Sequence, residues 1–376
     1  MNLALAADWL TTYGGAEHVI AEFLEMYPGA PLYTTVVRRE TIGPLASADI
    51  RTSRLQRLYR LIGKHQVLLT LMPRAVESLD VRGCDVLLSS SHAVGKGIIP
   101  ESRTLHVCYC HTPMRYAWEM EEVYLDDFGV PRMLRPFVRR QLDKLRRWDL
   151  TTAQRVDLFL ANSRTTQERI KRIYGRESIV IPPPVEDKFF DVTVRTAAPT
   201  SPYFLAVGRM VPYKRFDLLI EVANELKLPL TIVGRGQDEK RLRRLAGPTI
   251  TFAGFVPAQE LPALYANAEA LLFPQYEDAG IVQLEAQACG TPVIAFNAGG
   301  AQDLTKPGMT SILFDAQTKE SLTNAIETFR KLTWNRGTIR AFAENFSQKK
   351  FRERIKHEID AAYEDFTTGN RDRFFA

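Results

Sequence analysis

The chain has 376 residues, of which 45% are hydrophobic and 25% are charged, and its formal net charge is +5. This length exceeds what one compact core usually supports, so we expect two domains, and the composition excludes a disordered or fibrous protein. No apolar stretch is long enough to cross a membrane as a helix, and the first residues lack the basic segment of a signal peptide. With only four cysteines, the sequence favours a cytoplasmic protein without a disulfide framework.

The first half of the chain alternates short apolar runs with helical patterns. Residues 3–7 predict a first strand, which leads through a loop into a helix that begins near Ala16. Further strands are expected at residues 31–37, 85–89, 104–110, 156–161 and 178–181. Helical patterns cover residues 51–79, with interruptions at Gly63 and Pro73, residues 131–154, and residues 164–174 after a Ser163 N-cap.

A proline-rich and then polar segment, residues 182–202, has the composition of a linker and separates a second alternation from the first. Strands are expected there at residues 203–207, 230–233, 250–252, 270–273 and 293–296, with helices between them. This pattern predicts an α/β protein with two doubly wound parallel sheets, each in a Rossmann-like domain, with ligands at the carboxyl ends of the strands in a cleft between the domains. We place the domains at residues 1–190 and 203–346, and expect the helical segment 347–376 to cross back onto the first domain.

The most informative motif runs from Pro274 to Pro292. A loop after a buried strand carries the carboxylates Glu277 and Asp278, and a helix then opens with free N–H groups, which form a site for an anion such as a diphosphate. Glu285 lies about one helical turn further on. The plainer interpretation is an acidic loop that faces solvent before an ordinary helix.

The second motif is Gly208-Arg209 after a strand, with Lys214 before the next helix. When a sugar leaves a nucleoside diphosphate, negative charge develops on the β-phosphate, and fixed cations stabilise this charge without a metal ion. Arg209 and Lys214 are candidates for that role. The alternative is that both are solvated basic residues around a turn.

A third motif, Gly14-Gly15, ends the loop after the first strand and opens a helix. Glycines at such a point let the backbone approach a phosphate or a sugar closely. A glycine pair taken alone is more often only a turn.

A fourth motif, residues 108–118, places His111 directly after a buried strand and before aromatic and basic residues. If this strand edge faces the expected cleft, His111 contacts a ligand; otherwise it is a structural histidine. The string Cys108-Tyr109-Cys110-His111 also suggests a metal site. Its spacing does not fit a zinc knuckle and no second Cys/His pair lies elsewhere, so no metal site is predicted.

These motifs, in their order along the chain, resemble those of glycosyltransferase family 4, the retaining enzymes of the GT-B fold, and the resemblance extends over essentially the whole chain. It implies that Glu277 contacts the donor sugar and that Glu285 hydrogen-bonds the ribose hydroxyls. It also implies that the loop amides between these two glutamates hold sugar and phosphate, and that Arg209 and Lys214 bind the diphosphate.

Other segments match the family more weakly. His111 matches the first-domain histidine beside the donor sugar, and residues 299–303 resemble the family's Gly-Gly-x-x-Glu, with Asp303 in place of Glu. Ala279 is a departure, because the family often has Phe or Gly there, and this affects sugar selectivity rather than the reaction class. The donor-binding residues that we expect are Gly14, Gly15, Gly234, Phe255, Val256, Asp278, Ala279, Gly280, Ile281 and Glu285, with Phe255-Val256 in the segment that meets the nucleobase.

The string Cys-His-Thr-Pro-Met-Arg-Tyr-x-Trp at residues 110–118 resembles a narrower branch, whose members transfer mannose, usually from GDP-mannose, in bacterial O-antigen and polysaccharide assembly. The family resemblance implies a front-face mechanism in which the leaving diphosphate takes the acceptor proton, while Glu277 and His111 position the sugar. The sugar nucleotide is then a substrate, and no metal or other cofactor is required; the sequence has no Asp-x-Asp motif to bind a metal.

Three other interpretations stay open. The donor could be a UDP-sugar, the chain could be a nucleotide-sugar epimerase on the same fold, or it could be a catalytically silent binding module. An epimerase needs no acceptor, and it would leave unexplained the basic amphipathic stretch at residues 51–64 of the first domain. The joint presence of His111, Arg209, Lys214, Glu277 and Glu285 argues against a silent module.

The first domain has two strongly basic stretches. Residues 51–76 contain no acidic residue, and residues 132–147 carry a second group of arginines and lysines. Because acceptors in this branch are carried on polyprenyl diphosphate lipids, we expect peripheral binding to the anionic inner face of the cytoplasmic membrane. A solvated basic surface is the alternative, and no nucleic-acid partner is expected. The basic residues are Arg51, Arg54, Arg57, Arg60, Lys64, Arg132, Arg135, Arg139, Arg140, Lys144, Arg146 and Arg147.

Overall fold

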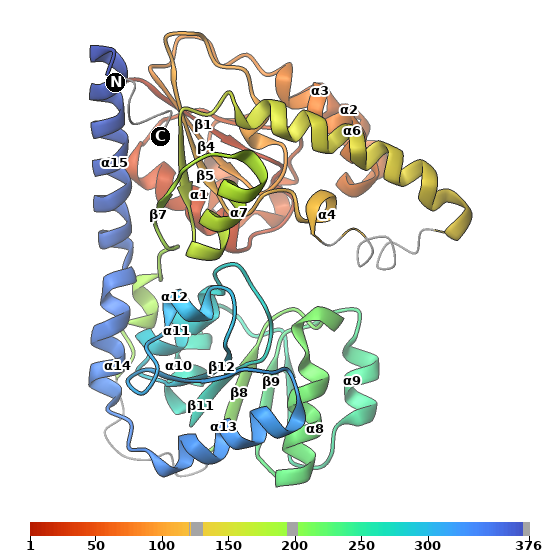
Figure 1. Ribbon diagram of the computed structural model, residues 1–376, viewed down its shortest axis with the longest axis vertical. Helices are drawn as coiled ribbons and strands as arrows, with labels where there is room; N and C mark the ends of the chain where they lie inside the picture. The colour runs from red at the N-terminus through yellow and green to blue at the C-terminus, as the bar shows by residue number, and fades with distance from the viewer. Residues whose placement is uncertain (120, 122–130, 194–201, 371–376) are drawn as a thin grey trace. The chain divides into compact units, whose positions relative to one another are not determined.

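The computed structural model describes residues 1–119, 121, 131–193 and 202–370, and the chain divides into two compact units. Unit 1 comprises Met1–Ile181 together with Arg352–Ala376, and unit 2 comprises Pro182–Phe351. The division falls before residue 190 because Val185 and Phe189 are buried in the core of unit 2. Figure 1 shows the elements of both units.

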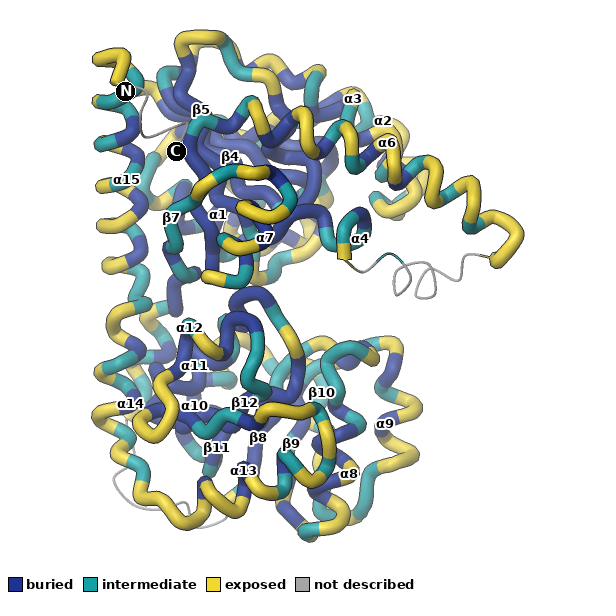
Figure 2. Tube along the Cα trace, viewed as in Figure 1, coloured by how far each residue is buried: buried dark blue, intermediate teal, exposed yellow. Residues whose placement is uncertain are grey.

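Unit 1 is built on a parallel sheet of seven strands in the order β3-β2-β1-β4-β5-β6-β7. The inner strands are buried because helices cover the sheet, as Figure 2 shows for β4 and β5. The strands are β1 (Leu3–Ala7), β2 (Leu32–Thr34), β3 (Ile50–Thr52), β4 (Val86–Ser91), β5 (Leu105–Cys110), β6 (Leu158–Ala161) and β7 (Ile179–Val180).

The helices of unit 1 pack by their apolar residues. Tyr59, Met72 and Val76 form one cluster with Ala4 and Ala6 of β1. The C-terminal helix belongs to this unit from Arg352 onward, and the Arg352 guanidinium donates to Glu22 at 2.6 Å. The helices are α1 (Gly15–Met26), α2 (Leu55–Ile62), α3 (Met72–Glu77), α4 (Arg115–Trp118), α6 (Arg135–Ala153), α7 (Arg164–Tyr174) and α15 (Gln348–Thr368).

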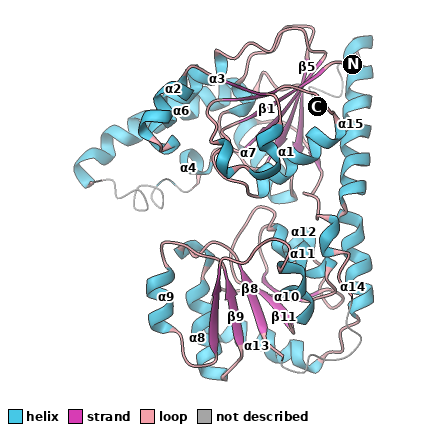
Figure 3. Ribbon diagram, turned by 180° about the vertical axis from the view of Figure 1, so that it is seen from behind, coloured by secondary structure: helices cyan, strands magenta, loops and turns pink. Residues whose placement is uncertain are grey.

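Unit 2 is built on a parallel sheet of six strands in the order β10-β9-β8-β11-β12-β13. The strands, several of which are magenta in Figure 3, are β8 (Phe204–Val207), β9 (Leu230–Val233), β10 (Ile250–Gly254), β11 (Ala270–Phe273), β12 (Val293–Phe296) and β13 (Ser311–Phe314). Expectation and structure thus agree on two parallel α/β sheets.

Alternate residues of the unit 2 strands enter two different cores. Phe204 and Ala206 of β8 lie in a cluster with α8 and α13, whereas Leu205 lies in a cluster with α10 and α11. Since successive side chains of a strand point to opposite faces, both faces of this sheet are covered. The helices are α8 (Phe216–Leu226), α9 (Glu239–Leu245), α10 (Leu261–Asn267), α11 (Ile281–Ala288), α12 (Ala301–Leu304), α13 (Lys319–Lys331) and α14 (Arg336–Ala343).

The structure corrects the sequence interpretation of residues 51–79. Gly63 ends α2 in a left-handed conformation, φ 72°, as expected, but Pro73 lies in the first turn of α3 and does not interrupt a helix. Arg51 is part of the short strand β3, where it binds Asp49 and Tyr33, so it is not on the basic helical face. A pairing partner, β2, overrides the local helical pattern at this point.

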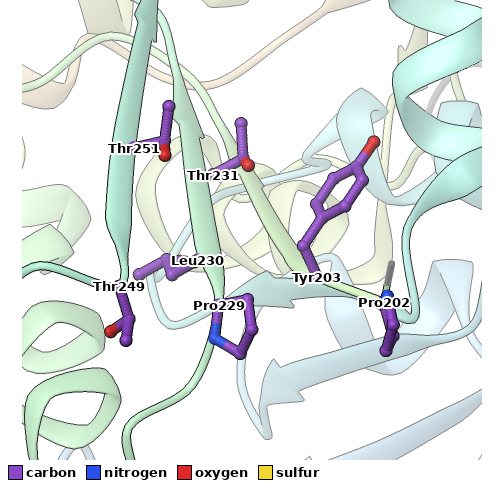
Figure 4. A pocket seen from close by; sticks show the side chains of 7 residues that line it. All are labelled: Pro202, Tyr203, Pro229, Leu230, Thr231, Thr249 and Thr251. Atoms are coloured by element: carbon purple, nitrogen blue, oxygen red, sulfur yellow. The ribbon is translucent and has the colours of Figure 1, made fainter. Parts of the chain in front are cut away.

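A surface hollow of about 410 Å³ lies at the amino ends of β8, β9 and β10 (Figure 4). It is lined by Pro202, Tyr203, Pro229, Leu230, Thr231, Thr249 and Thr251, none of which is charged. It therefore lies at the edge of the sheet opposite to the expected ligand site.

Among the helices that the structure describes, none has both the length and the apolar character of a membrane span.

Candidate active site

Each sheet has one point where the direction of winding reverses. In unit 2 this point lies between β8 and β11, and in unit 1 it lies between β1 and β4. In open parallel sheets, ligands bind outside the carboxyl ends of the strands at such a point. The residues that follow these four strands are therefore the place to examine in each unit.

At the reversal in unit 2, Lys214 and Glu277 form an ion pair. Lys214 follows β8, Glu277 follows β11, and the distance from Lys214 Nζ to Glu277 Oε1 is 2.7 Å. The two side chains are only 13% and 20% exposed. Two residues singled out in separate motifs are thus brought together by the parallel pairing of β8 with β11.

The loops after β8 and β9 approach each other closely through their backbones. A Cβ atom on Gly234, φ 126°, would lie 2.0 Å from the carbonyl oxygen of Gly208, and one on Gly236 would lie 2.0 Å from that of Met210. Only glycine fits at these positions. Gly234 thus serves loop packing, and Arg209 is left exposed beside it, with no ion-pair partner among the described residues.

The loop that carries Glu277 is braced by Gly299 and Gly300. The Gly300 N–H donates to the Glu277 carbonyl at 2.9 Å. A Cβ atom on Gly299 would lie 2.2 Å from that same oxygen, and one on Gly300 would lie 2.1 Å from the Ala279 carbonyl. The paired glycines of this motif therefore fix the position of the acidic loop.

Helix α11 begins behind this loop. Its N-cap, Gly280, has φ 77° and lies against the Phe273 ring. Ile281 is half-buried, and Asp278 and Ala279 are buried beside it. Glu285, one turn on, accepts a hydrogen bond of 2.7 Å from the hydroxyl of buried Tyr265, a contact that spacing could not reveal.

Phe255 and Val256 follow β10 at the same edge of the sheet. The Phe255 side chain is 71% exposed, which is unusual for a large aromatic residue, and Val256 is half-buried. Strand β10 ends in Gly254 with φ 69°, which turns the chain toward these residues. An exposed ring at a strand end is available to stack on a planar ligand.

In unit 1, Gly14 and Gly15 open helix α1 as expected. The Gly14 N–H already donates to Glu17 Oε2 at 3.0 Å, so this amide is occupied by the protein. A Cβ atom on Gly15 would meet no atom within 4 Å, so Gly15 faces open space.

His111 follows β5 at the same edge of the unit 1 sheet. Its Nε2 lies 2.8 Å from Ser90 Oγ, and Thr166 donates to its carbonyl at 3.1 Å. Burial, together with the charge of His92, lowers the pKa of His111 to about 3, so this imidazole is neutral at physiological pH.

An unexpected feature of this edge is the pair formed by Asp8 and His92. His92 Nδ1 lies 2.8 Å from Asp8 Oδ2, and the loop N–H groups of His92, Ala93 and Gly95 also donate to this carboxylate. The pair lies at the reversal between β1 and β4. The sequence did not predict this pair because the two residues are far apart in the chain. They meet because β1 and β4 pair in parallel with Ala7 opposite Ser90, so that the two strands end side by side.

Two family models match the chain, one after the other. The model described as Glycosyltransferase Family 4 matches residues 13–189, and the model described as Glycosyl transferases group 1 matches residues 188–348. This chain belongs to glycosyltransferase family 4. The fold of this family 4 member is GT-B, with one Rossmann-like sheet in each unit.

Curated relatives of this family 4 chain have different activities in their names. A GDP-mannose-dependent α-(1-6)-phosphatidylinositol monomannoside mannosyltransferase of Mycolicibacterium smegmatis is 31% identical over 198 residues, 45% of this chain and 52% of that one. A glycogen synthase of Pseudomonas syringae is 31% identical over 192 residues, 48% of this chain and 36% of that one. The chain thus spans about half, or less, of the length of these relatives.

Solved structures agree on the fold over nearly the whole chain. Anabaena HepE in complex with UDP has a TM-score of 0.69 at 19% identity and covers 96% of this chain and 100% of its own. Sucrose-phosphate synthase from Thermosynechococcus elongatus has a TM-score of 0.68 at 16% identity, with 96% and 99% covered.

Replacing Gly299 with alanine is expected to destabilise the acidic loop more than the same change at Gly308. Both glycines have positive φ, so both substitutions cost about 1–2 kcal/mol in backbone strain. Only Gly299 also places a Cβ atom against the Glu277 carbonyl, which adds roughly 1–3 kcal/mol of overpacking. Thermal unfolding of the two variants measures the difference. Equal melting temperatures would show that the loop yields easily and is not braced at Gly299.

Proposed function

We propose that this chain is a retaining glycosyltransferase that moves a hexosyl group from a nucleoside diphosphate sugar to a hydroxyl of a glycan or lipid-linked glycan. The observation that carries the proposal is the Lys214–Glu277 pair at the reversal of the unit 2 sheet, with Arg209 exposed nearby. A cation for a leaving diphosphate and a carboxylate for a sugar hydroxyl are thus held within hydrogen-bond distance of each other.

In the proposed reaction, Arg209 and Lys214 stabilise the charge that develops on the diphosphate, together with the amides at the start of α11. Glu277 accepts hydrogen bonds from the sugar, and neutral His111 provides a further polar contact without repelling a cationic transition state. The leaving phosphate takes the acceptor proton, as in a front-face mechanism. Because protein groups meet the phosphate charge, transfer requires no metal.

The donor proposed is GDP-mannose, and the product belongs to cell-surface polysaccharide or lipopolysaccharide. Two GDP-mannose-dependent mannosyltransferases of Mycolicibacterium smegmatis, 31% and 33% identical over their matched segments, support mannose. The UDP complex of HepE supports a UDP-sugar as the second candidate. Glu285 and Phe255 are proposed to contact ribose and base, which both donors possess.

Replacement of Arg209 or Lys214 by alanine is expected to cut turnover roughly 100-fold or more, as loss of a transition-state charge contact does. Lys240→Ala, which removes an exposed lysine of α9, is the matched control. Turnover is measured with GDP-mannose and with UDP-glucose, and near-wild-type rates in both variants would refute the assigned roles.

Turnover of the wild-type chain is expected to survive EDTA, because protein groups meet the phosphate charge. Full loss of turnover in EDTA, with restoration by Mg²⁺ or Mn²⁺, would refute this. Conversion of the donor into an epimer without acceptor would identify an epimerase.

We further propose that unit 1 binds the anionic face of the cytoplasmic membrane, where lipid-linked acceptors lie. Exposed apolar side chains accompany the basic residues of α2 and of the turn that leads into α6. Leu61 of α2 is 86% exposed, while Met133 and Phe137 are 92% and 64% exposed. Arg57 and Arg60 are exposed on the same helix as Leu61. Basic residues with exposed apolar neighbours are typical of helices that lie in a membrane interface.

Charge reversal of Arg54, Arg57 and Arg60 to Glu is expected to weaken sedimentation with anionic liposomes. Each Lys or Arg near an anionic surface contributes about 1 kcal/mol, and the effect weakens with salt. Reversal of Arg82 and Arg103, which already pair with Asp80 and Glu101, is the control. Equal recovery of the wild-type chain in the supernatant with neutral and anionic liposomes at low salt would mean that this surface is only solvated.

A further inference from the structure

The first unit carries a histidine that no part of the proposed mechanism uses. His92 follows β4, is about one-third exposed, and is bound through Nδ1 to the buried carboxylate of Asp8. Its ring lies edge-on to Trp9, with ring centroids 4.9 Å apart, and Trp9 stacks on His65 at 4.8 Å. The imidazole is thus held in one orientation by a carboxylate on one atom and an indole on its edge.

The loop that presents His92 is itself firmly anchored. Asp8 accepts from Ser91 Oγ and from loop N–H groups, while Lys96 Nζ donates to the Ala93 carbonyl and pairs with buried Asp149. These bonds hold the loop in its conformation, and the His92 ring is not needed for that. His92 Nε2 makes no hydrogen bond to any of the described residues, so one nitrogen of a well-oriented imidazole remains available to a ligand.

The position of this pair parallels that of Lys214–Glu277. Each lies at the point where its own sheet reverses, and each joins the residues that follow the two strands flanking that point. Since such points are where open parallel sheets bind ligands, an oriented polar group there is a candidate ligand contact. His111 is its neighbour, with the two ring centroids 6.5 Å apart.

We propose that His92, oriented by Asp8, binds a hydroxyl of the donor sugar, donating from Nε2 to the hydroxyl oxygen beside His111. This inference rests on the proposed function and adds a sugar-contacting residue to it. The ring centroids of His92 and His111 are 6.5 Å apart, and His111 Nε2 already bonds Ser90 Oγ, so His92 Nε2 is the atom assigned to the sugar hydroxyl. A neutral hydroxyl suits the site better than a phosphate, because Asp8 and Glu17 are carboxyl groups on its border.

The surrounding charges favour the protonated, donor form of His92, and the Asp8 carboxylate balances its positive charge. Burial lowers its pKa, but the charge and hydrogen bond of Asp8 and the charge of Glu17 outweigh burial, so the pKa lies above the ordinary histidine value. Lys96 acts in the opposite direction, and the neighbouring His111 and His65 have pKa values of about 3 and about 4. Neutral His92 would keep its proton on Nδ1 for Asp8, so Nε2 would lose its N–H as the pH rises.

The test compares the affinity for a sugar nucleotide with the affinity for the corresponding nucleoside diphosphate; the ratio of the two is the affinity gained from the sugar. Calorimetric titrations compare GDP with GDP-mannose, and UDP with UDP-glucose, and use the pair that the wild-type chain binds better. His92→Phe keeps a ring against Trp9 but removes the donor, and His65→Phe is the matched control on the same indole. Melting temperatures check that both variants are folded.

The affinity gained from the sugar should fall about tenfold or more in His92→Phe and stay unchanged in His65→Phe, while affinity for the bare diphosphate stays unchanged in both. In the wild-type chain the gain should fall as the pH rises through the His92 pKa, and this dependence should disappear in His92→Gln. An unchanged gain in His92→Phe, or an equal fall in His65→Phe, would overturn the sugar contact while the proposed function stands. A wild-type chain that binds neither sugar nucleotide nor diphosphate would overturn the proposed function as well.

Discussion

The constraint on which the rest depends is the parallel pairing of β8 with β11 and of β1 with β4. Because all strands of each sheet run in one direction, every loop that follows a strand emerges at the same edge. At the reversal in unit 2 this brings Lys214 to Glu277, and at the reversal in unit 1 it brings Asp8 to His92. Opposite charges stabilise each other at each of the two reversals.

A pair of this kind is compatible with ligand binding because it is only partly buried. Lys214 and Glu277 keep 13% and 20% of their surface, so each can exchange its partner for a phosphate or a hydroxyl without leaving a charge isolated in an apolar core. The close backbone contacts at Gly234, Gly236 and Gly299 leave little freedom in the loops that carry them. Rigid loops with replaceable ion pairs suit a site that must hold charge as it develops.

Much of this arrangement could be predicted from the sequence because its signals are local. The strand–helix alternation gave the two parallel sheets, and Ser163 caps α7 as expected, accepting from the Thr166 N–H. The short strand β3 could not be predicted, since its three residues pair with β2 against their local helical pattern. Asp8–His92 and Tyr265–Glu285 depend on strand register and helix packing, which spacing along the chain does not encode.

The most direct test of the account is the affinity for GDP, measured by titration calorimetry, of the wild-type chain, Lys214→Met, Glu277→Gln and the double variant. The account predicts that Lys214→Met weakens GDP binding about tenfold or more, because a charge-assisted hydrogen bond is lost. Glu277→Gln should leave GDP affinity unchanged or tighter, because Lys214 no longer has a competing carboxylate. Equal losses in both single variants, or no change in either, would contradict it and make the pair only a structural link between two loops.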